Sequence, residues 1–234
     1  MKNLFFISAL LILFCNNLTA QSGKIGVSSL SWSISSNTLT ISGNEKMPDF
    51  SKTSDIPWYN YRSNIENVII KPNVTSIGER AFQGCNKLKN IDIPNSVTAI
   101  GQSAFLNCSA LKNVDIPNSV TAIGQAAFFK CFGLNNINIP NNMSSLQDYI
   151  FYGCSGLTEI IIPANISSIG IQAFYSCTSL KSFTSLAATP PTVLANAFSE
   201  VDLSLVTLFV PASSLQKYDS KTEWKEFNSI LPVK

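Results

Sequence analysis

The sequence repeats itself every 23 residues. Residues 77–99 read IGERAFQGCNKLKNIDIPNSVTA, and residues 100–122 read IGQSAFLNCSALKNVDIPNSVTA. Five such copies begin at Ile77, Ile100, Ile123, Leu146 and Ile169. A fixed period of this length indicates a solenoid, in which each copy is one structural unit that buries its apolar edge only against its neighbours.

The repeat unit is I-G-x-x-A-F-x-x-C-x-x-L-x-x-I-x-I-P-x-x-V-x-x, with repeat positions 1–23 counted from the first isoleucine. Positions 12–17 end in an alternation of apolar and other side chains, which is the period of a strand with one buried face. The proline at position 18 cannot donate to a β-ladder and ends that strand. V-x-x-I-G predicts a second short extended piece with a bend at the glycine, and A-F-x-x-C predicts a tight helical or irregular return.

The unit resembles the leucine-rich repeats of the BspA-like family of bacterial surface and secreted proteins. The resemblance rests on I-G-x-x-A-F-x-x-C-x-x-L-x-x-I-x-I-P, which all five copies keep with small departures such as Leu146-Gln147 for Ile-Gly. It extends to LSWSISSNTLTISGNEKMPDF, similar to the family's N-terminal hairpin, and to LFVPASSLQKYDSKTEWKEFNSI, similar to its C-terminal closure. The resemblance implies a leucine-rich-repeat solenoid with a parallel β-sheet on one face, short helical or irregular turns on the other, an N-terminal β-hairpin cap and a C-terminal helical cap.

Four segments follow from this organisation. We expect a signal peptide over 1–20, an N-terminal cap over 21–64, leucine-rich repeats over 65–200 and a C-terminal cap over 201–234. The repeat segment comprises a half unit, the five 23-residue repeats and a degenerate sixth. Caps are needed because an open solenoid exposes its core and a row of unpaired strand groups at each end. Ser213 and Gln216 match a capping box, which predicts a short helix that begins near Ser214.

The first twenty residues have the layout of a secretory signal peptide. Lys2 precedes an apolar run over 4–14, and Ala20 offers a small residue for cleavage after it. Acylation of Cys15 requires small residues before the cysteine, and Leu13 and Phe14 stand there instead. We therefore expect a protein that is secreted or held at the cell surface or in the periplasm, without a lipid on Cys15 and without a transmembrane span.

Composition argues against several functions. The net charge is only +2, so no basic field is available for nucleic acid. The chain contains no histidine, which removes the commonest general acid–base group and metal ligand. Only 13% of the residues are charged, so much of the chain must enter a core. We expect no catalytic activity, no cofactor and no metal ion.

One cysteine occupies position 9 of every repeat. We interpret these five residues as a buried structural ladder of free thiols, because equivalent side chains stack and a buried cysteine packs like a small hydrophobe. Disulfide bonds are an alternative in an exported protein, and a soft-metal site is another, although no C-x-x-C pair is present. The ladder comprises Cys85, Cys108, Cys131, Cys154 and Cys177.

One further pattern has a structural rather than a chemical explanation. Asp92 and Asp115 share one repeat position and should lie on adjacent turns, superficially like the two carboxylates of a retaining glycosidase. In the next three repeats the same position holds Asn138, Ile161 and Thr184. This variation favours the interpretation that the two aspartates are solvated strand residues and not a catalytic pair.

Two surfaces are candidates for binding. The first, which we name the strand face, comprises the outward residues of the predicted strand at positions 13, 14 and 16, a polar grid on a stiff sheet of the kind that repeat proteins use for partners. Its candidate residues are Lys89, Asn90, Asp92, Lys112, Asn113, Asp115, Asn135, Asn136, Asn138, Thr158 and Glu159. The second is an aromatic stripe of Phe129, Phe132, Tyr152 and Tyr175, which either faces outward as an apolar surface or packs against the return turn.

The sequence therefore favours an exported binding protein. The resemblance implies cell-surface adhesion to a host or neighbouring cell through a protein partner, and we expect a monomer. Carbohydrate recognition is an alternative, in which Phe129, Tyr152 and Tyr175 stack on sugar rings. A structural envelope component without an external ligand is a further alternative.

Overall fold

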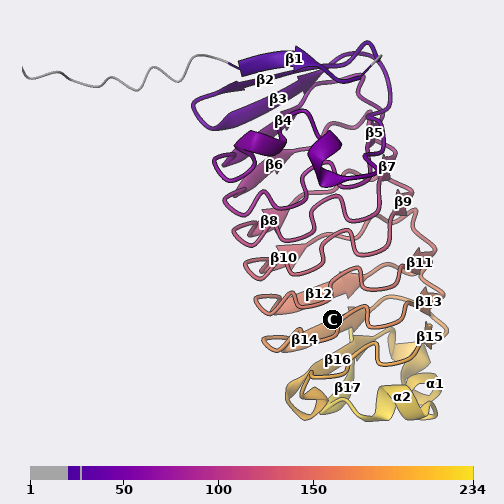
Figure 1. Cartoon of the computed structure of the whole chain (residues 1–234). Coiled ribbons are helices and arrows are strands. Elements are labelled where there is room, and N and C mark those ends of the chain that lie inside the picture. The colour runs from indigo at the N-terminus through magenta and orange to yellow at the C-terminus, as the bar shows by residue number, and fades with distance from the viewer. Residues whose placement is uncertain (1–20, 27, 234) are drawn as a thin grey trace, which may run out of the picture.

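The computed structural model describes residues 21–26 and 28–233 and shows a column of stacked turns (Figure 1). Each turn has three sides: a strand of a first column, a two-residue strand of a second column, and a return made of tight turns. A β-hairpin lies at the N-terminal end of the column and two short helices lie at the C-terminal end. The predicted solenoid with its two caps is confirmed.

The first column runs the length of the molecule and carries the strand face. Its strands pair in parallel with a register of one repeat, so that Asn67 lies beside Asn90 and Glu159 beside Ser182. Hydrogen bonds divide the column into three sheets, β1-β2-β3-β4-β6, β8-β10 and β12-β14-β16-β17. The strands that follow the hairpin are β4 (Asn67–Ile70), β6 (Asn90–Asp92), β8 (Asn113–Val114), β10 (Asn136–Ile137), β12 (Glu159–Ile162), β14 (Ser182–Ser185), β16 (Thr207–Val210) and β17 (Ser229–Pro232).

The second column confirms the extended piece that V-x-x-I-G predicts. Its parallel strands form two separate sheets, β5-β7-β9 and β11-β13-β15. They are β5 (Ser76–Ile77), β7 (Ala99–Ile100), β9 (Ala122–Ile123), β11 (Ser145–Leu146), β13 (Ser168–Ile169) and β15 (Thr192–Val193).

The return is irregular, and the helical alternative is wrong for the repeats. Positions 4 and 8 have positive φ in successive turns, as at Arg80 (58°) and Gly84 (77°), which breaks any helical run. Backbone N–H groups then point along the column to the next turn, and the amide nitrogen of Phe82 lies 2.8 Å from the carbonyl oxygen of Ala104. The return is thus a third hydrogen-bonded side, which satisfies its buried peptide groups.

The core is one continuous file inside the column. The position-6 phenylalanines stack ring on ring, with centroids between 5.2 Å (Phe105–Phe128) and 5.8 Å (Phe128–Phe151) apart. Trp58 continues the stack at the N-terminal end, 6.0 Å from Phe82. Offset and parallel rings at this spacing add stabilisation beyond the area that they bury.

The N-terminal cap continues the first column. Its strands are β1 (Gln21–Lys24), β2 (Ser31–Ser35) and β3 (Thr38–Ser42), followed by the 3-10 turns η1 (Thr53–Asp55) and η2 (Tyr59–Tyr61). Ser36 and Asn37 both have positive φ (45° and 62°) between β2 and β3, as a tight two-residue hairpin turn requires. β3 pairs in parallel with β4, and the buried Trp58 donates from Nε1 to the carbonyl of Ala81 over 2.8 Å. The N-terminal cap is therefore bonded to the half unit through the backbone of β3 and to the first repeat through the side chain of Trp58.

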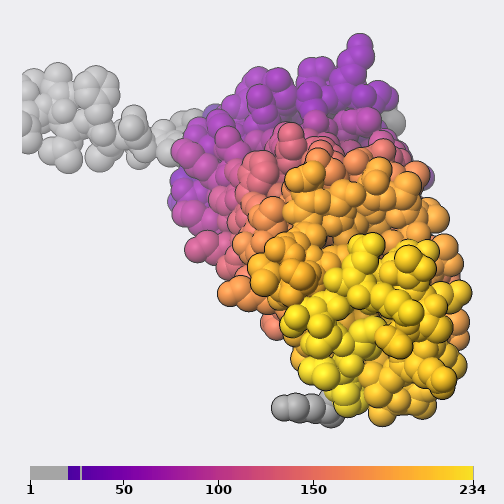
Figure 2. Space-filling view, turned by 90° about the horizontal axis from the view of Figure 1, so that it is seen from below, coloured from indigo at the N-terminus to yellow at the C-terminus, as the bar shows by residue number. Residues whose placement is uncertain are grey.

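The C-terminal cap closes the other end, where Figure 2 shows the yellow C-terminal residues lying over the last orange turns. It comprises η3 (Leu203–Leu205), η4 (Ala212–Ser214), α1 (Leu215–Asp219), α2 (Thr222–Lys225) and β17. The predicted capping box is wrong: α1 begins at Leu215 without a side-chain cap, and the buried Ser214 hydroxyl donates instead to the carbonyl of Ala188 over 3.0 Å. Trp224 and Phe227 are buried in this cap.

The repeat glycines permit close approach rather than a bend. Gly101, Gly124 and Gly170 do not have positive φ, but a Cβ on any of them would lie 2.5 Å from a backbone nitrogen of the preceding turn. Only a hydrogen in place of a side chain lets the turns meet at this corner.

Replacing Gly124 with Ala should therefore lower the free energy of unfolding by about 2 kcal/mol, because the backbone of the preceding turn cannot give way as a side chain would. Urea unfolding followed by circular dichroism measures the change. Gln147→Ala is the matched control: Gln147 holds the same repeat position one turn further on, where a Cβ is already present, so we expect almost no loss there. Equal losses in the two variants would contradict the steric explanation.

Candidate functional site

The strand face is a flat polar surface built by the first column. Positions 14 and 16 alternate with buried positions 15 and 17, as the pleat of a strand dictates. All eleven strand-face residues predicted from the sequence are exposed. The ladder register places equivalent residues of successive turns side by side, as for Asn113 and Asn136.

Several of these side chains already have partners within the chain. Lys89 Nζ lies 2.7 Å from Glu66 Oε2, and this bond, with the lysine charge, lowers the pKa of the Glu66 carboxyl. The amide of Asn90 donates to Asn67 Oδ1 over 2.9 Å. Exposed contacts of this kind contribute little stability, but they order the side chains that a partner meets.

Asn138 has a structural task that the sequence did not reveal. Its Oδ1 accepts from the backbone nitrogen of Ile116 over 2.7 Å, and its Nδ2 donates to the carbonyl of Ile116 over 2.6 Å. The amide side chain thus takes the place of a neighbouring peptide group. Asn138 is exposed, but both ends of its amide already have partners.

One part of the strand face is apolar. Ile161 occupies position 16, where the preceding turns carry Asp92, Asp115 and Asn138, and 56% of its surface is exposed. Leu186 is 37% exposed and lies beside it. Together with Asn138, Glu159 and other residues they line a hollow of about 340 Å³. Ile161 follows from the repeat register, whereas Leu186 lies in the degenerate end of the fifth repeat, where no template position identifies it.

Asp92 and Asp115 lie on this open face rather than in a cleft. Both are exposed, and neither carboxylate has a hydrogen-bond partner within the described residues. Their strands, β6 and β8, belong to different sheets. Within residues 21–26 and 28–233, no three His, Cys, Asp or Glu side chains come together in an arrangement that could hold a metal ion.

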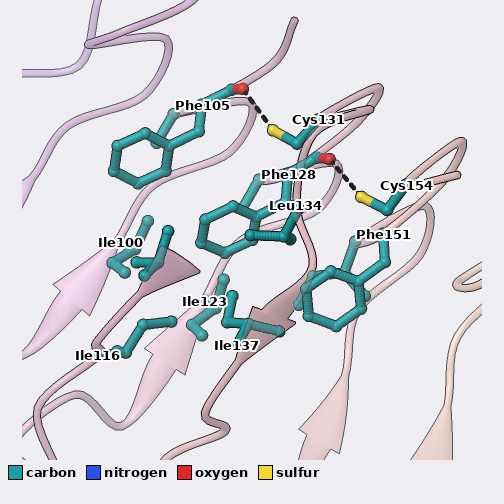
Figure 3. Packing of buried hydrophobic residues seen from close by; sticks show 14 of the residues in the cluster. Ile100, Phe105, Ile116, Ile123, Phe128, Cys131, Leu134, Ile137, Phe151 and Cys154 are labelled. Atoms are coloured by element: carbon teal, nitrogen blue, oxygen red, sulfur yellow. Dashed lines mark hydrogen bonds between the residues drawn. The ribbon is translucent and has the colours of Figure 1, made fainter. Parts of the chain in front are cut away.

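The five position-9 cysteines form a single buried file beside the phenylalanines, as Figure 3 shows for two of them. All five are free thiols. Four of them donate to the phenylalanine carbonyl 26 residues earlier; Cys131 Sγ lies 3.1 Å from the oxygen of Phe105, and Cys154 Sγ lies 3.1 Å from that of Phe128. The thiol is therefore both a small apolar filler and a bond between turns.

Burial controls the ionisation of these thiols. Desolvation raises the pKa of Cys85, Cys131 and Cys177 from an ordinary 9.0 to about 12. Desolvation also raises the pKa of Cys108 and Cys154 well above that value. The thiolate is the nucleophile and the metal ligand, so a file that stays protonated is chemically inert at neutral pH.

The aromatic stripe has three of its four predicted members in contact. The rings of Phe129 and Tyr152 stack at 4.5 Å and 7°, and those of Tyr152 and Tyr175 at 4.6 Å and 8°. All three side chains are partly buried. Phe132 is 48% exposed and makes no ring contact within the described residues, so it does not belong to a contiguous stripe.

This stacking decides what the stripe can offer a ligand. The inner ring faces cover one another. Sugars stack on open aromatic faces, and Tyr152, the central ring, has both of its faces covered. The central ring therefore offers no open face to a sugar.

Another hollow lies away from both predicted surfaces, at the C-terminal cap. It has a volume of about 640 Å³, and its lining includes four acidic residues, Glu200, Asp202, Glu223 and Glu226. It is open to solvent and contains none of the predicted site residues. Within the described part of the chain, no helix is long and apolar enough to cross a membrane.

A comparison with protein families matches this chain to one of them. The model described as "BspA type Leucine rich repeat region" matches residues 54–181 and 98–222, in six copies. No protein with curated annotation matches the chain.

Solved structures show similar architecture at low sequence identity. A leucine-rich repeat protein from Eubacterium ventriosum is 20% identical, with coverage of 91% of this chain and 85% of that one and a TM-score of 0.40. A leucine rich cell surface protein from Faecalibacterium prausnitzii is 21% identical, with coverage of 87% and 71% and a TM-score of 0.47. The T. pallidum leucine-rich repeat protein is 21% identical, with coverage of 68% and 91% and a TM-score of 0.44.

The thiol pKa values predict a loss of stability in alkali. The unfolded chain releases thiol protons as the pH rises past 9.0, whereas folded Cys131 keeps its proton until about 12, so rising pH favours the unfolded state across this window. We expect the urea midpoint to fall between pH 8 and pH 10.5. A double variant, Cys108→Ala with Cys131→Ala, should show a smaller fall over the same range, and an equal fall would show that lysines and tyrosines cause the effect.

The stacked rings predict that Tyr152 stabilises the fold. Tyr152→Ser removes two stacked ring contacts and a tilted one with Tyr149, so the free energy of unfolding should drop by about 1–2 kcal/mol. Phe132→Ser is the matched control, because Phe132 makes no such contact and should cost almost nothing. If Tyr152→Ser left the thermal midpoint unchanged, the stripe would be a free surface rather than packing.

Proposed function

Because this chain belongs to the BspA-type leucine-rich repeat family, we propose that it is an exported, non-enzymatic binding protein that contacts a protein partner through its strand face. The family is one of repeat scaffolds, and the fold presents the strand face as a continuous surface. The proposed site is centred on Ile161 and Leu186 and is bordered by the polar residues of the grid.

The observation that carries the proposal is the exposure of Ile161. Position 16 is polar at Asp92, Asp115 and Asn138 but is held in the fourth repeat by an isoleucine with more than half of its surface in water. The exposed Leu186 lies beside it, and both line a hollow of about 340 Å³. Protein interfaces commonly combine an apolar centre with a polar rim. Binding an apolar side chain of a partner in this hollow removes the surface from water.

Order on each side of the hollow favours binding by this face. On one side β12 and β14 form a continuous ladder, and on the other the side chain of Asn138 is held by Ile116. Surfaces that are ordered before binding lose little conformational entropy when a partner binds. The affinity then depends on complementarity to the apolar centre and the polar grid.

A protein partner fits these features better than a glycan does. The hollow combines aliphatic residues such as Ile161 and Leu186 with Asn and Glu residues and has no aromatic ring in its lining, and the central ring of the aromatic stripe, Tyr152, has no open face for a sugar. The role that fits an exported chain of this family is adhesion to a host or neighbouring cell.

The test measures binding of the labelled mature chain to epithelial and bacterial cells by flow cytometry. Ile161→Lys with Leu186→Lys should lower binding at least about tenfold, because each charge would be placed in an apolar contact. Leu205→Lys is the matched control, since Leu205 is a 69% exposed leucine on the C-terminal cap that does not line the hollow.

Three outcomes separate the competing functions. Protein adhesion requires that protease treatment of the cells abolish binding. Binding that survives protease but is lost after glycosidase treatment would establish the carbohydrate alternative. If light scattering shows self-association and no cell binds, the chain is a structural component and the proposal is wrong.

A further inference from the structure

The fourth repeat breaks the glycine rule at the corner of the second column. Gly101, Gly124 and Gly170 each lie so close to the preceding turn that an added Cβ would be 2.5 Å from its backbone. Gln147 holds this position in the fourth repeat and carries a Cβ. The corner between the third and fourth repeats therefore cannot close to the same spacing.

The hydrogen bonds of the second column stop at this corner. The amide of Gly124 donates to Ile100 over 2.8 Å and that of Gly170 to Leu146 over 2.9 Å. Within the described residues, neither Gln147 nor Ser144 donates in the corresponding way to the third repeat, and β9 and β11 lie in separate sheets. A hollow of about 330 Å³ lies between these strands.

The first column is interrupted at the same boundary. β10 and β12 belong to different sheets and are joined by one isolated bridge, between Asn138 and Ile161. The strand-face hollow of about 340 Å³ also lies here. Within the described part of the chain, this is the one boundary between full repeats where neither column has a continuous ladder.

The return side stays closed across the boundary. The amides of Ala126, Phe128 and Lys130 donate to the fourth repeat over 3.0, 3.0 and 2.7 Å. The rings of Phe128 and Phe151 still stack, but at 5.8 Å they are the most widely spaced of the phenylalanine pairs in the file. The first column keeps only that bridge and a 3.4 Å bond from the amide of Thr158 to the carbonyl of Asn135. Within the described residues the second column has no ladder bond here, whereas the return is bonded throughout, which is the geometry of a hinge.

We propose that the boundary between the third and fourth repeats is a joint at which the solenoid opens and closes, with the return as its hinge. Gln147 holds the joint apart, and two blocks of repeats move about it. Regions with few backbone hydrogen bonds open at lower free energy than the rest of a fold, so motion concentrates here. The joint does not depend on the function proposed above.

One consequence does rest on the proposed function. The hollow around Ile161 spans the joint, so the position of the joint sets the width of the proposed partner site. An apolar side chain that fills the hollow would hold the two blocks at one angle. Because the joint itself is measured without a partner, failure to find a partner would leave the test of the joint intact.

Amide hydrogen exchange of the full mature chain, resolved by NMR, tests the joint. The amides of Ser144 and Gln147 should exchange at least about tenfold faster than those of their equivalents, Ser167 and Gly170, since one net hydrogen bond is worth up to about a factor of ten. In Gln147→Gly the exchange of the residue 147 and Ser144 amides should slow to the rates of these equivalents. Gln147→Ala is the matched control and should leave Ser144 fast, because its Cβ still blocks closure.

A cross-link tests whether the two columns open together. Asn138 and Ile161 are bridge partners, so Asn138→Cys with Ile161→Cys can form a disulfide across the first column. Oxidation should slow exchange at Ser144 by about tenfold, and reduction should restore it. Slow exchange at Ser144 and Gln147 in the unmodified chain would overturn the proposal, as would a Gln147→Gly variant that exchanges as fast as Gln147→Ala.

Discussion

Four of the five buried thiols bond their own turn to the one before it, because each Sγ donates to a phenylalanine carbonyl 26 residues earlier. This contact exists only when successive turns lie directly above one another. The same alignment places phenyl rings face to face and brings the peptide groups of the return within bonding distance of the next turn. The core therefore requires one register, and a slip of a single residue would disrupt the thiol, ring and peptide contacts together.

This alignment also decides the surface. Because the turns stack in register, residues at the same repeat position lie side by side, and the outward positions of the strands form rows of similar residues. Repetition alone yields a uniform, solvated face. The features that suggest function are the departures from it: Ile161 in a polar row, and Gln147 in a row of glycines. Both lie at the boundary between the third and fourth repeats, where the ladders are interrupted.

Much of the fold was predictable because a strict period removes ambiguity. Residues that recur at the same repeat position share one environment. Repeat position therefore predicts the buried cysteines and phenylalanines, the strand that ends at proline and the exposed strand-face residues. The glycines were misinterpreted as bends, because the close approach that requires them is made to a residue more than twenty positions away. The capping box at Ser213 failed for a related reason, since the adjacent Ser214 bonds to Ala188 and the helix begins without a side-chain cap.

The sequence by itself determined the period, and with it the solenoid, the buried file and the identity of the outward residues, since each follows from which side chains recur and how often. Only the tertiary structure decided which outward residues are free to bind and at which boundary the β-ladders between turns are interrupted. The side chain of Asn138 is hydrogen-bonded to the backbone of Ile116, and the ring of Phe132 does not stack with the other rings. Leu186 and Ile161 line the same hollow. These outcomes depend on contacts between residues of different turns, and no pattern within a single repeat specifies them.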